Sequence, residues 1–270
     1  MTWPMSAPVF LLDQDLWDDV QPGDLAYLGG EEARHALRVQ RLKPGESVEL
    51  VDGRGRRLLG QVAEMSAQAS PADNGEALLA VSIQQIRREV DRAAGLVLVQ
   101  ALAKGGRDEM AVEAAVELGI SMVVPWQAER SVARWPGAKA QRGQQRWQAI
   151  CRSAVKVSRR SWLPEVATLK RTDQLVDALG SPGSLVWPDA ALLVLHESAA
   201  TSFVEAVTAL PLTSPVVIMV GPEGGISDAE IAALCQVGGQ PVRLGQAVLR
   251  TSTAGPAALA ALAGLRGHWS

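Results

Sequence analysis

Two short segments of the chain combine glycines with polar side chains where apolar runs end. Residues 221–225 (GPEGG) follow the apolar run 216–220, and residues 244–254 (LGQAVLRTSTA) follow a second, shorter run. Glycine accepts positive φ angles and lets a ligand approach the backbone more closely than a Cβ would allow. Both segments lead into helix-like sequence, so we expect them at neighbouring strand-to-helix turns, where α/β proteins bind ligands.

The glycine-rich segment does not fit the common phosphate-binding motifs. It lacks the GxGxxG spacing of a dinucleotide-binding turn and the Gly-Lys-Ser/Thr of a P-loop. Such a turn can also be no more than a tight strand–helix connection, and that alternative stays open. The second segment contributes Arg250, a cation among small and apolar residues. An arginine at a helix start can face a substrate anion, cap a carbonyl or pair with a carboxylate.

The charges of the chain are unevenly distributed. The net charge is −3, but residues 130–171 carry 11 basic side chains and a single acid, Glu165, whereas residues 1–90 carry 14 acids and 9 bases. This basic stretch, whose expected helix over 141–161 contains no acid, predicts contact with nucleic-acid phosphates, with a solvated amphipathic helix as the alternative. On a helix over 141–161, an arc of about 140° contains Arg142, Arg146, Arg152, Lys156, Arg159 and Arg160.

The bulk properties are typical of a globular, soluble protein. The 270 residues suffice for one large domain or two modest ones. No apolar run approaches the roughly 20 residues of a membrane span, and the N-terminus lacks the pattern of a secretory signal. Cys151 and Cys235 are far apart, so neither a disulfide framework nor a metal site is expected. We therefore expect a cytoplasmic protein.

Residues 1–88 are predicted to form a small β-rich domain. Strand-like runs separated by glycine and polar residues favour hairpins. The expected elements are a short helix between 30 and 44, strands over 47–51 and 57–64 joined by a hairpin connection at 52–55, a loop over 66–75, a strand over 77–86 and a linker over 87–92.

Residues 89–270 are predicted to form an α/β domain with a mainly parallel sheet. Buried apolar runs alternate with helical periodicity, which is the pattern of βαβ units. Ser227 and Glu230 form a capping box that starts a helix after the glycine-rich segment. The expected strands are 96–102, 120–124, 192–195, 216–220 and 242–244, and the other expected helices are 108–118, 141–161, 202–209 and 253–265.

Together, the two glycine-bearing segments resemble the cofactor-binding end of the SPOUT class of S-adenosylmethionine-dependent RNA methyltransferases. The chain is most similar to the family that methylates N3 of a uridine in 16S ribosomal RNA, and this resemblance covers nearly all of residues 20–265. It implies S-adenosylmethionine as cofactor. The residues that match the family's cofactor-binding positions are Leu195, His196, Glu197, Gly221, Pro222, Glu223, Gly224, Gly225, Leu244, Gly245, Leu249, Thr251 and Ala254.

The resemblance also suggests catalytic roles. Methylation at uracil N3 requires loss of the imide proton, which leaves negative charge on the ring oxygens. A fixed guanidinium from Arg250 would stabilise that anion and orient the base. Glu223 and bulk water are both candidates for the general base. The family's usual Thr-Glu-Thr-Ala reads TSTA here, with Ser252 in place of the glutamate, so a carboxylate role does not transfer.

The resemblance further implies that residues 1–88 form a PUA-like β-barrel that binds RNA. The candidate contacts are Arg34, Arg38 and Arg41, at i, i+4 and i+7 of the expected helix, and Arg54 at the hairpin. A plain surface helix is the alternative, and His35 could be a buried packing residue. Val157 and Ala114 depart from the family, which often has Gln and Lys at these positions.

Three more expectations come from the resemblance alone. They are a deep trefoil knot in residues 89–270, a homodimer whose interface helps to complete the active site, and a small ribosomal subunit or its 16S RNA as partner. Two alternative functions stay open. One is methylation of another acceptor, such as a ribose 2′-OH or a guanine nitrogen, and the other is a non-catalytic RNA-binding assembly factor.

Overall fold

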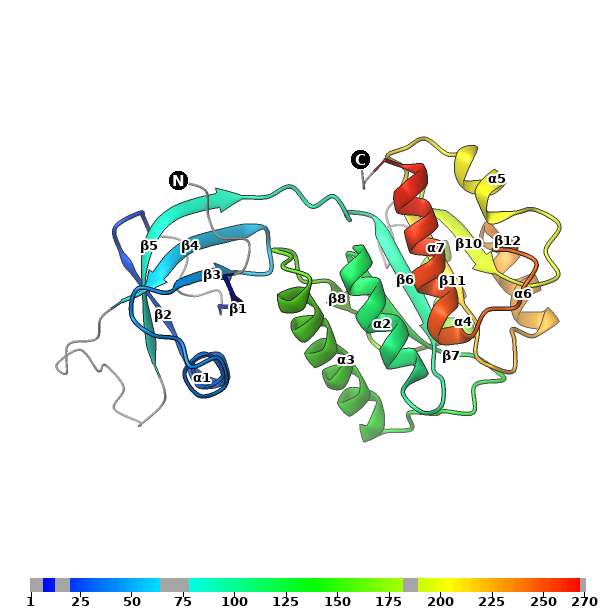
Figure 1. The fold of residues 1–270 in the computed structure, drawn as a ribbon. Helices are drawn as coiled ribbons and strands as arrows, with labels where there is room; N and C mark the ends of the chain where they lie inside the picture. Colours follow the sequence, from blue (N-terminus) through cyan, green and yellow to red (C-terminus); the bar gives the residue numbers. More distant parts are fainter. Residues whose placement is uncertain (1–6, 13–19, 64–77, 182–188, 268–270) are drawn as a thin grey trace. The chain divides into compact units, whose positions relative to one another are not determined.

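The computed structural model describes residues 7–12, 20–63, 78–181 and 189–267. They divide between two units, drawn together in Figure 1. The first unit consists of residues 1–91 and 155–163, and the second of residues 92–154 and 164–270. The first unit is thus built from two separate stretches of chain. The loop expected over 66–75 lies outside the described residues.

A five-stranded mixed sheet forms the centre of the first unit. Its strands are β1 (Val9–Leu11), β2 (Leu25–Leu28), β3 (Ser47–Val51), β4 (Arg56–Val62) and β5 (Leu79–Arg88). The order is β1-β3-β4-β5-β2, with β1 parallel to β3 and the other neighbours antiparallel. Phe10, Val48 and Leu50 are among the fully buried residues of its core. The hairpin expected between β3 and β4 is observed.

The helix expected after Gly30 is short and changes type. α1 (Gly30–Arg34) continues into a π-helical turn, His35–Val39. Arg41 lies beyond this turn and has a φ of +54°. A π-turn holds more residues than an α-turn, so the spacing of the three arginines does not produce the single helical stripe that we expected.

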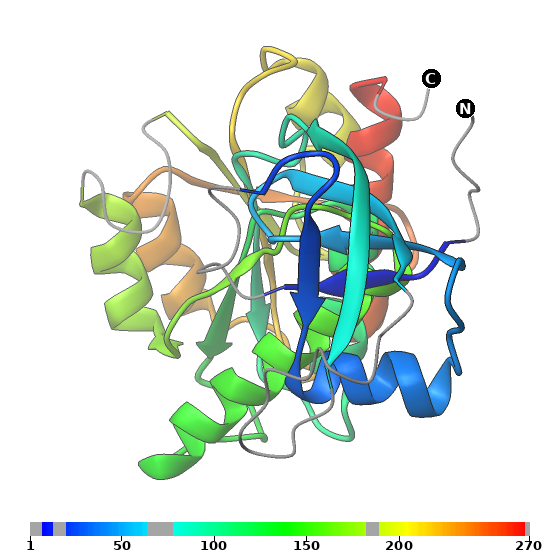
Figure 2. The ribbon, with the colours of Figure 1, turned by 90° about the vertical axis from the view of Figure 1, so that its left-hand side faces the viewer.

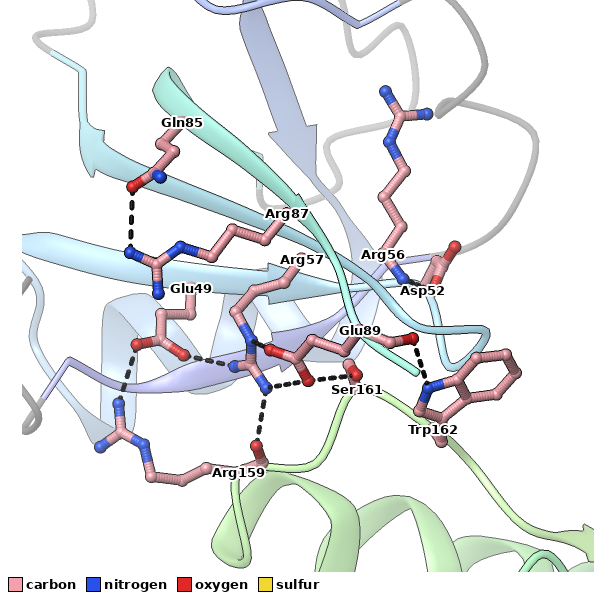
Figure 3. Close-up of polar contacts among 10 residues, drawn as sticks. All are labelled: Glu49, Asp52, Arg56, Arg57, Gln85, Arg87, Glu89, Arg159, Ser161 and Trp162. Atoms are coloured by element: carbon pink, nitrogen blue, oxygen red, sulfur yellow. Dashed lines mark hydrogen bonds and ion pairs between the residues drawn. The ribbon is translucent and has the colours of Figure 1, made fainter. Parts of the chain in front are cut away.

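The second stretch of the first unit is held by a network of charged side chains (Figure 3). Arg57, on β4, donates hydrogen bonds to Glu49, to Glu89 and to the carbonyl oxygen of Arg159. The Arg159 guanidinium pairs with Glu49 at 3.0 Å, and the Ser161 hydroxyl donates to Glu89. Burial opposes ionisation of Glu89, but the bonds from Arg57 and Ser161 outweigh it and lower the pKa of this carboxyl.

The hairpin between β3 and β4 accommodates this stretch through a glycine. A Cβ on Gly55 would lie 2.5 Å from the Trp162 ring, and the φ of Gly55 is +92°. The Trp162 indole N–H donates to the backbone oxygen of Glu89 at 3.0 Å. Glu89 therefore belongs to the packed first unit, and the linker expected over 87–92 was placed too early, because β5 continues into it.

The second unit contains a parallel sheet. Its strands are β6 (Leu96–Ala101), β7 (Met122–Gln127), β8 (Glu165–Val166), β9 (Lys170–Arg171), β10 (Ala191–Leu195), β11 (Val216–Val220) and β12 (Gly239–Val242). The order is β12-β10-β11-β6-β7-β8, β9 also pairs with β7, and every pairing among these strands is parallel. β6 and β11 are buried throughout, as strands covered on both faces require. The α/β prediction is confirmed, while the knot stays a prediction.

Helices cover both faces of this sheet (Figures 1 and 2). They are α2 (Arg107–Leu118), α4 (Thr172–Gly180), α5 (Phe203–Thr208), α6 (Asp228–Gln236) and α7 (Thr251–Leu265), besides α3 (Ala138–Val157). Val97 shares a core cluster with Leu175 of α4 and Leu234 of α6. The neighbouring Leu98 faces α7, where a Cβ on Gly255 would lie 3.0 Å from it. None of the described helices is long and apolar enough to cross a membrane.

Several expected boundaries were wrong. α3 ends at Val157 instead of 161, and Arg159 after it takes a left-handed φ of +58°. β7 begins at Met122 instead of 120, and β12 ends where the strand expected over 242–244 was to begin. The short strands β1, β2, β8 and β9 and the helix α4 were not expected.

Candidate active site

The two glycine-bearing segments follow β11 and β12. We expected neighbouring turns, but β10 lies between these two strands in the sheet. Both segments line a cavity of about 640 Å³, and the second segment also lines a smaller one of about 80 Å³. All thirteen residues proposed for cofactor binding line one or both of these cavities. The larger cavity is lined by Leu195, His196, Glu197, Gly221, Pro222, Glu223, Gly224, Gly225, Leu249, Thr251 and Ala254, and the smaller one adds Leu244 and Gly245.

Each glycine of the first segment is required for a separate reason. A Cβ on Gly221 would lie 2.6 Å from the Ile226 side chain, and one on Gly224 would lie 3.0 Å from Cβ of Arg130 and 3.2 Å from its carbonyl oxygen. Gly225 has a φ of +74°, which side chains rarely tolerate. The loop is therefore tightly packed and shaped before any ligand arrives, and the capping box of Ser227 then starts α6.

The two segments are joined by a single hydroxyl group. Thr251, the first residue of α7, donates from Oγ1 to the carbonyl oxygen of Gly221 at 2.9 Å. The Thr251 Oγ1 in turn accepts a hydrogen bond from Nε2 of Gln100 at 2.9 Å. Gln100 is fully buried at the end of β6. Gln100 was not among the site residues predicted from the sequence.

Arg250 lines the larger cavity and is exposed. It is the N-cap residue of α7, yet its side chain makes no capping hydrogen bond. Among the described residues, no carboxylate pairs with its guanidinium. Within the described part of the chain, the Arg250 side chain therefore neither caps the helix nor forms an ion pair. Its guanidinium remains available to a ligand.

Glu223 is already engaged. Its Oε1 accepts hydrogen bonds from the backbone N–H of Lys104 at 3.2 Å and from Nη1 of Arg107 at 3.1 Å. Accepting a proton would cost Glu223 this ion pair. Next to Arg107, the buried Asp108 caps the same turn by accepting from the Ala103 N–H, and burial raises the pKa of its carboxyl.

Arg107 and Arg130 also line the larger cavity, and sequence analysis assigned neither a role there. Nη1 of Arg130 donates to the carbonyl oxygen of Gly224 at 3.3 Å. The turn that carries Arg130 is held by the buried carboxylate of Glu230, which accepts from the Glu129 N–H at 2.8 Å. Arg107 follows β6 and Arg130 follows β7, both at the carboxyl ends of the parallel strands. This position could have identified them as candidate site residues.

The cations assigned to the expected long helix do not form one free basic face. Arg146 pairs with Glu109, Lys156 with Glu32, and Arg159 with Glu49. Arg159 and Arg160 lie beyond the end of α3, so the arc calculated for a continuous helix does not apply to them. Arg142 and Arg152 lie on α3, and Arg142 is exposed.

The candidate RNA contacts of the first unit lie at four places along its chain. Arg34 ends α1, Arg38 is exposed in the π-helical turn, and Arg41 follows it. Arg54 lies in the hairpin, where its backbone N–H bonds to Asp52. His35 is half-buried and packs edge-on against the Phe10 ring with centroids 6.2 Å apart, in agreement with the packing alternative.

Comparison with known proteins gives consistent matches. Residues 91–263 match the RNA methyltransferase domain family, and residues 28–69 match the RNA methyltransferase PUA domain family. Ribosomal RNA small subunit methyltransferase E of Mycobacterium tuberculosis is 40% identical over 247 residues, covering 92% of this chain and 89% of the relative. Its counterpart in Bacillus subtilis is 28% identical over 237 residues, covering 86% and 87%.

Solved structures agree with these matches. Ribosomal RNA small subunit methyltransferase E from Neisseria gonorrhoeae, bound to S-adenosyl methionine, superposes with a TM-score of 0.78 at 26% identity, over 96% of this chain and 98% of that one. A putative methyltransferase from Legionella pneumophila in complex with the same cofactor gives 0.77 at 26% identity, over 96% and 97%. This chain belongs to the ribosomal RNA small subunit methyltransferase E family.

Proposed function

We propose that this protein transfers a methyl group from S-adenosylmethionine to N3 of a uridine in the 16S RNA of the small ribosomal subunit. The observation that carries the proposal is the cavity formed by the two glycine-bearing segments of a chain that belongs to this family. Its volume, about 640 Å³, lies within the range of roughly 300–1,000 Å³ that is common for small-molecule sites.

The residues around the cavity suit this cofactor. The packed loop of Gly221 and Gly224 offers a rigid backbone cradle, and Leu195, Leu249 and Ala254 supply apolar surface for a purine. When bound, S-adenosylmethionine would supply a methyl group already activated by its sulfonium, so the transfer requires no metal. The protein contributes proximity and orientation.

Arg250 is the residue proposed to act on the substrate. Its guanidinium, which pairs with no carboxylate of the described residues, would face the ring oxygens of a uridine that has lost its N3 proton, and would stabilise that anion. Glu223 and solvent water both stay candidates for the proton acceptor, and in that role Glu223 would give up its ion pair with Arg107. Ser252 leaves no carboxylate at its position to share this role.

The remaining parts of the proposal concern partners. We place the protein in the cytoplasm as a homodimer, with residues 1–88 as an RNA-binding domain and residues 89–270 as the methyltransferase domain. Exposed cations, including Arg38, Arg54 and Arg142, would contact RNA phosphates.

The first test is methyl transfer from labelled S-adenosylmethionine to small ribosomal subunits that lack the modification, with the product nucleoside identified by mass. Recovery of 3-methyluridine supports the proposal, whereas 2′-O-methylation or a methylguanosine would replace it. Arg250→Ala should bind cofactor normally but lose about 10²-fold in turnover, as when one oxyanion donor is removed. Arg266→Ala, at the opposite end of α7, is the matched control and should retain turnover.

A further inference from the structure

A hydrogen-bond relay lies directly beneath the cofactor cavity. It starts at Gln100, which points from β6 toward α7 and is fully buried. It passes through the Thr251 hydroxyl and ends at the carbonyl oxygen of Gly221. The three residues come from β6, the start of α7 and the end of β11, so the relay connects both cofactor segments to the centre of the sheet.

The relay has one direction. Nε2 of Gln100 donates to the carbonyl oxygen of Ala101 at 3.1 Å and to Oγ1 of Thr251 at 2.9 Å, which uses both of its protons. Rotating the amide by 180° would place Oε1 against the Ala101 oxygen, and two acceptors repel. The Thr251 hydroxyl must therefore accept from Gln100, and its only proton is left for Gly221.

Gln100 is an unfavourable choice for packing alone. Its Oε1 is buried and has no hydrogen-bond partner within the described part of the chain. A buried acceptor without a partner destabilises the folded state, and a methionine of similar size would avoid this penalty. The favourable contribution of Gln100 is thus what Nε2 does to Thr251.

We propose that Gln100 is a positioning residue of the cofactor site. By orienting the Thr251 hydroxyl toward Gly221, it fixes the spacing between the turn before α7 and the glycine-rich loop, and so keeps the cavity open in its binding shape. The inference rests on the proposed function in naming S-adenosylmethionine as the ligand. Gln100 itself does not line the cavity.

The test is a double-mutant cycle on the full chain with Gln100→Met, Thr251→Val and both together. Calorimetry measures the Kd for S-adenosylmethionine, and thermal unfolding measures stability. One lost hydrogen bond predicts a Kd about three- to tenfold higher for Gln100→Met, with the melting temperature unchanged or higher. The double variant should bind like Thr251→Val alone, because Gln100 acts only through the hydroxyl. Thr251→Ser, which keeps the hydroxyl but lacks the methyl group, should recover most of the affinity that Thr251→Val loses.

Two results would overturn the inference. One is a Kd of Gln100→Met equal to that of the wild type, and the other is a double variant whose loss is the product of the two single losses. Hydrogen exchange of residues 221–226 without cofactor provides a second readout, and Gln100→Met should exchange faster there. If the wild-type protein does not bind S-adenosylmethionine at all, the proposed function fails, while the exchange measurement still decides whether the relay holds the loop.

Discussion

Replacing Arg57 by methionine should release residues 155–163 from the first unit. Arg57 is the most buried of the charged donors that link the two stretches of this unit, since it bonds to Glu49 and Glu89 of one stretch and to the Arg159 carbonyl of the other. Methionine retains much of the apolar stem but none of the donors. Two carboxylates that faced a buried cation would then lack it.

The contacts that remain in Arg57→Met determine how much stability the variant loses. Removing one partner of a buried ion pair destabilises by about 3–5 kcal/mol. The side chains of Arg57 and Glu49 are only 8% and 9% exposed, but that of Glu89 is 38% exposed and can be hydrated. Glu49 also keeps its pair with Arg159. We therefore expect the lower end of the range, about 3 kcal/mol.

Hydrogen exchange measured by mass spectrometry resolves this loss by segment. A loss of about 3 kcal/mol speeds exchange through local opening roughly 100-fold. That acceleration should be found in peptides covering 155–163 and β4, and peptides covering β11 in the second unit should be unchanged. Arg87→Met is the matched control, because Arg87 lies opposite Arg57 on β5, is exposed and bonds only to Gln85 among the residues drawn in Figure 3.

Unchanged protection of residues 155–163 in Arg57→Met would refute this reasoning, and so would an equal effect of Arg87→Met. The first result would mean that apolar packing around Trp162 holds the segment without the charges. The second would mean that the net charge of the sheet, and not the specific network, is what matters.

Three other predictions follow from individual contacts. Gly224→Ala should raise the Kd for S-adenosylmethionine at least tenfold, measured by calorimetry, because its Cβ would meet Arg130 at 3.0 Å. Gly264→Ala on α7 should leave binding unchanged, because its Cβ would meet no described atom outside its own helix within 4 Å. The folded-state pKa of Glu89 lies below its ordinary value of 4.5, so its contribution to stability is present above pH 4.5 and is lost as pH falls through the folded value. Denaturant titrations of Glu89→Gln at different pH values should lack this loss of stability. A Glu89→Gln variant with the same acid dependence as the wild type would contradict the prediction. Arg142→Glu should lower the log–log salt slope of RNA binding by about 1, whereas a slope equal to that of the wild type would assign Arg142 to solvent.

Local chemistry explains what could be predicted from the sequence. Gly221, Gly224 and Gly225 identify their turn by residue type alone, and the capping box of Ser227 and Glu230 starts α6 as expected. Long apolar runs located the buried strands to within three residues, because a strand covered on both faces tolerates few polar side chains. The strands β8 and β9 have two residues each and carry no such signal.

Pairings between distant residues explain what could not be predicted. A helical projection counts only the acids on its own helix, and Glu32, Glu49 and Glu109 approach the cations of residues 146–159 from other elements. Arg130 enters the cavity from a turn more than 90 residues before the glycine loop. The π-helical turn at His35–Val39 has no periodic signature, so arginine spacing alone pointed to a regular stripe.

Because the first unit is built from two stretches of chain, its folding during synthesis must wait for the second stretch. When residue 91 has been made, Arg57 and Glu89 still lack the Arg159 carbonyl and the Ser161 hydroxyl, which are encoded about 70 residues later. At synthesis rates of 5–20 residues per second, that interval is roughly 4–14 s. During this time the nascent sheet presents charges without their final partners. The first unit is therefore completed only after the first two strands of the second unit, β6 and β7, have been translated. The two units cannot fold strictly one after the other in the order of synthesis.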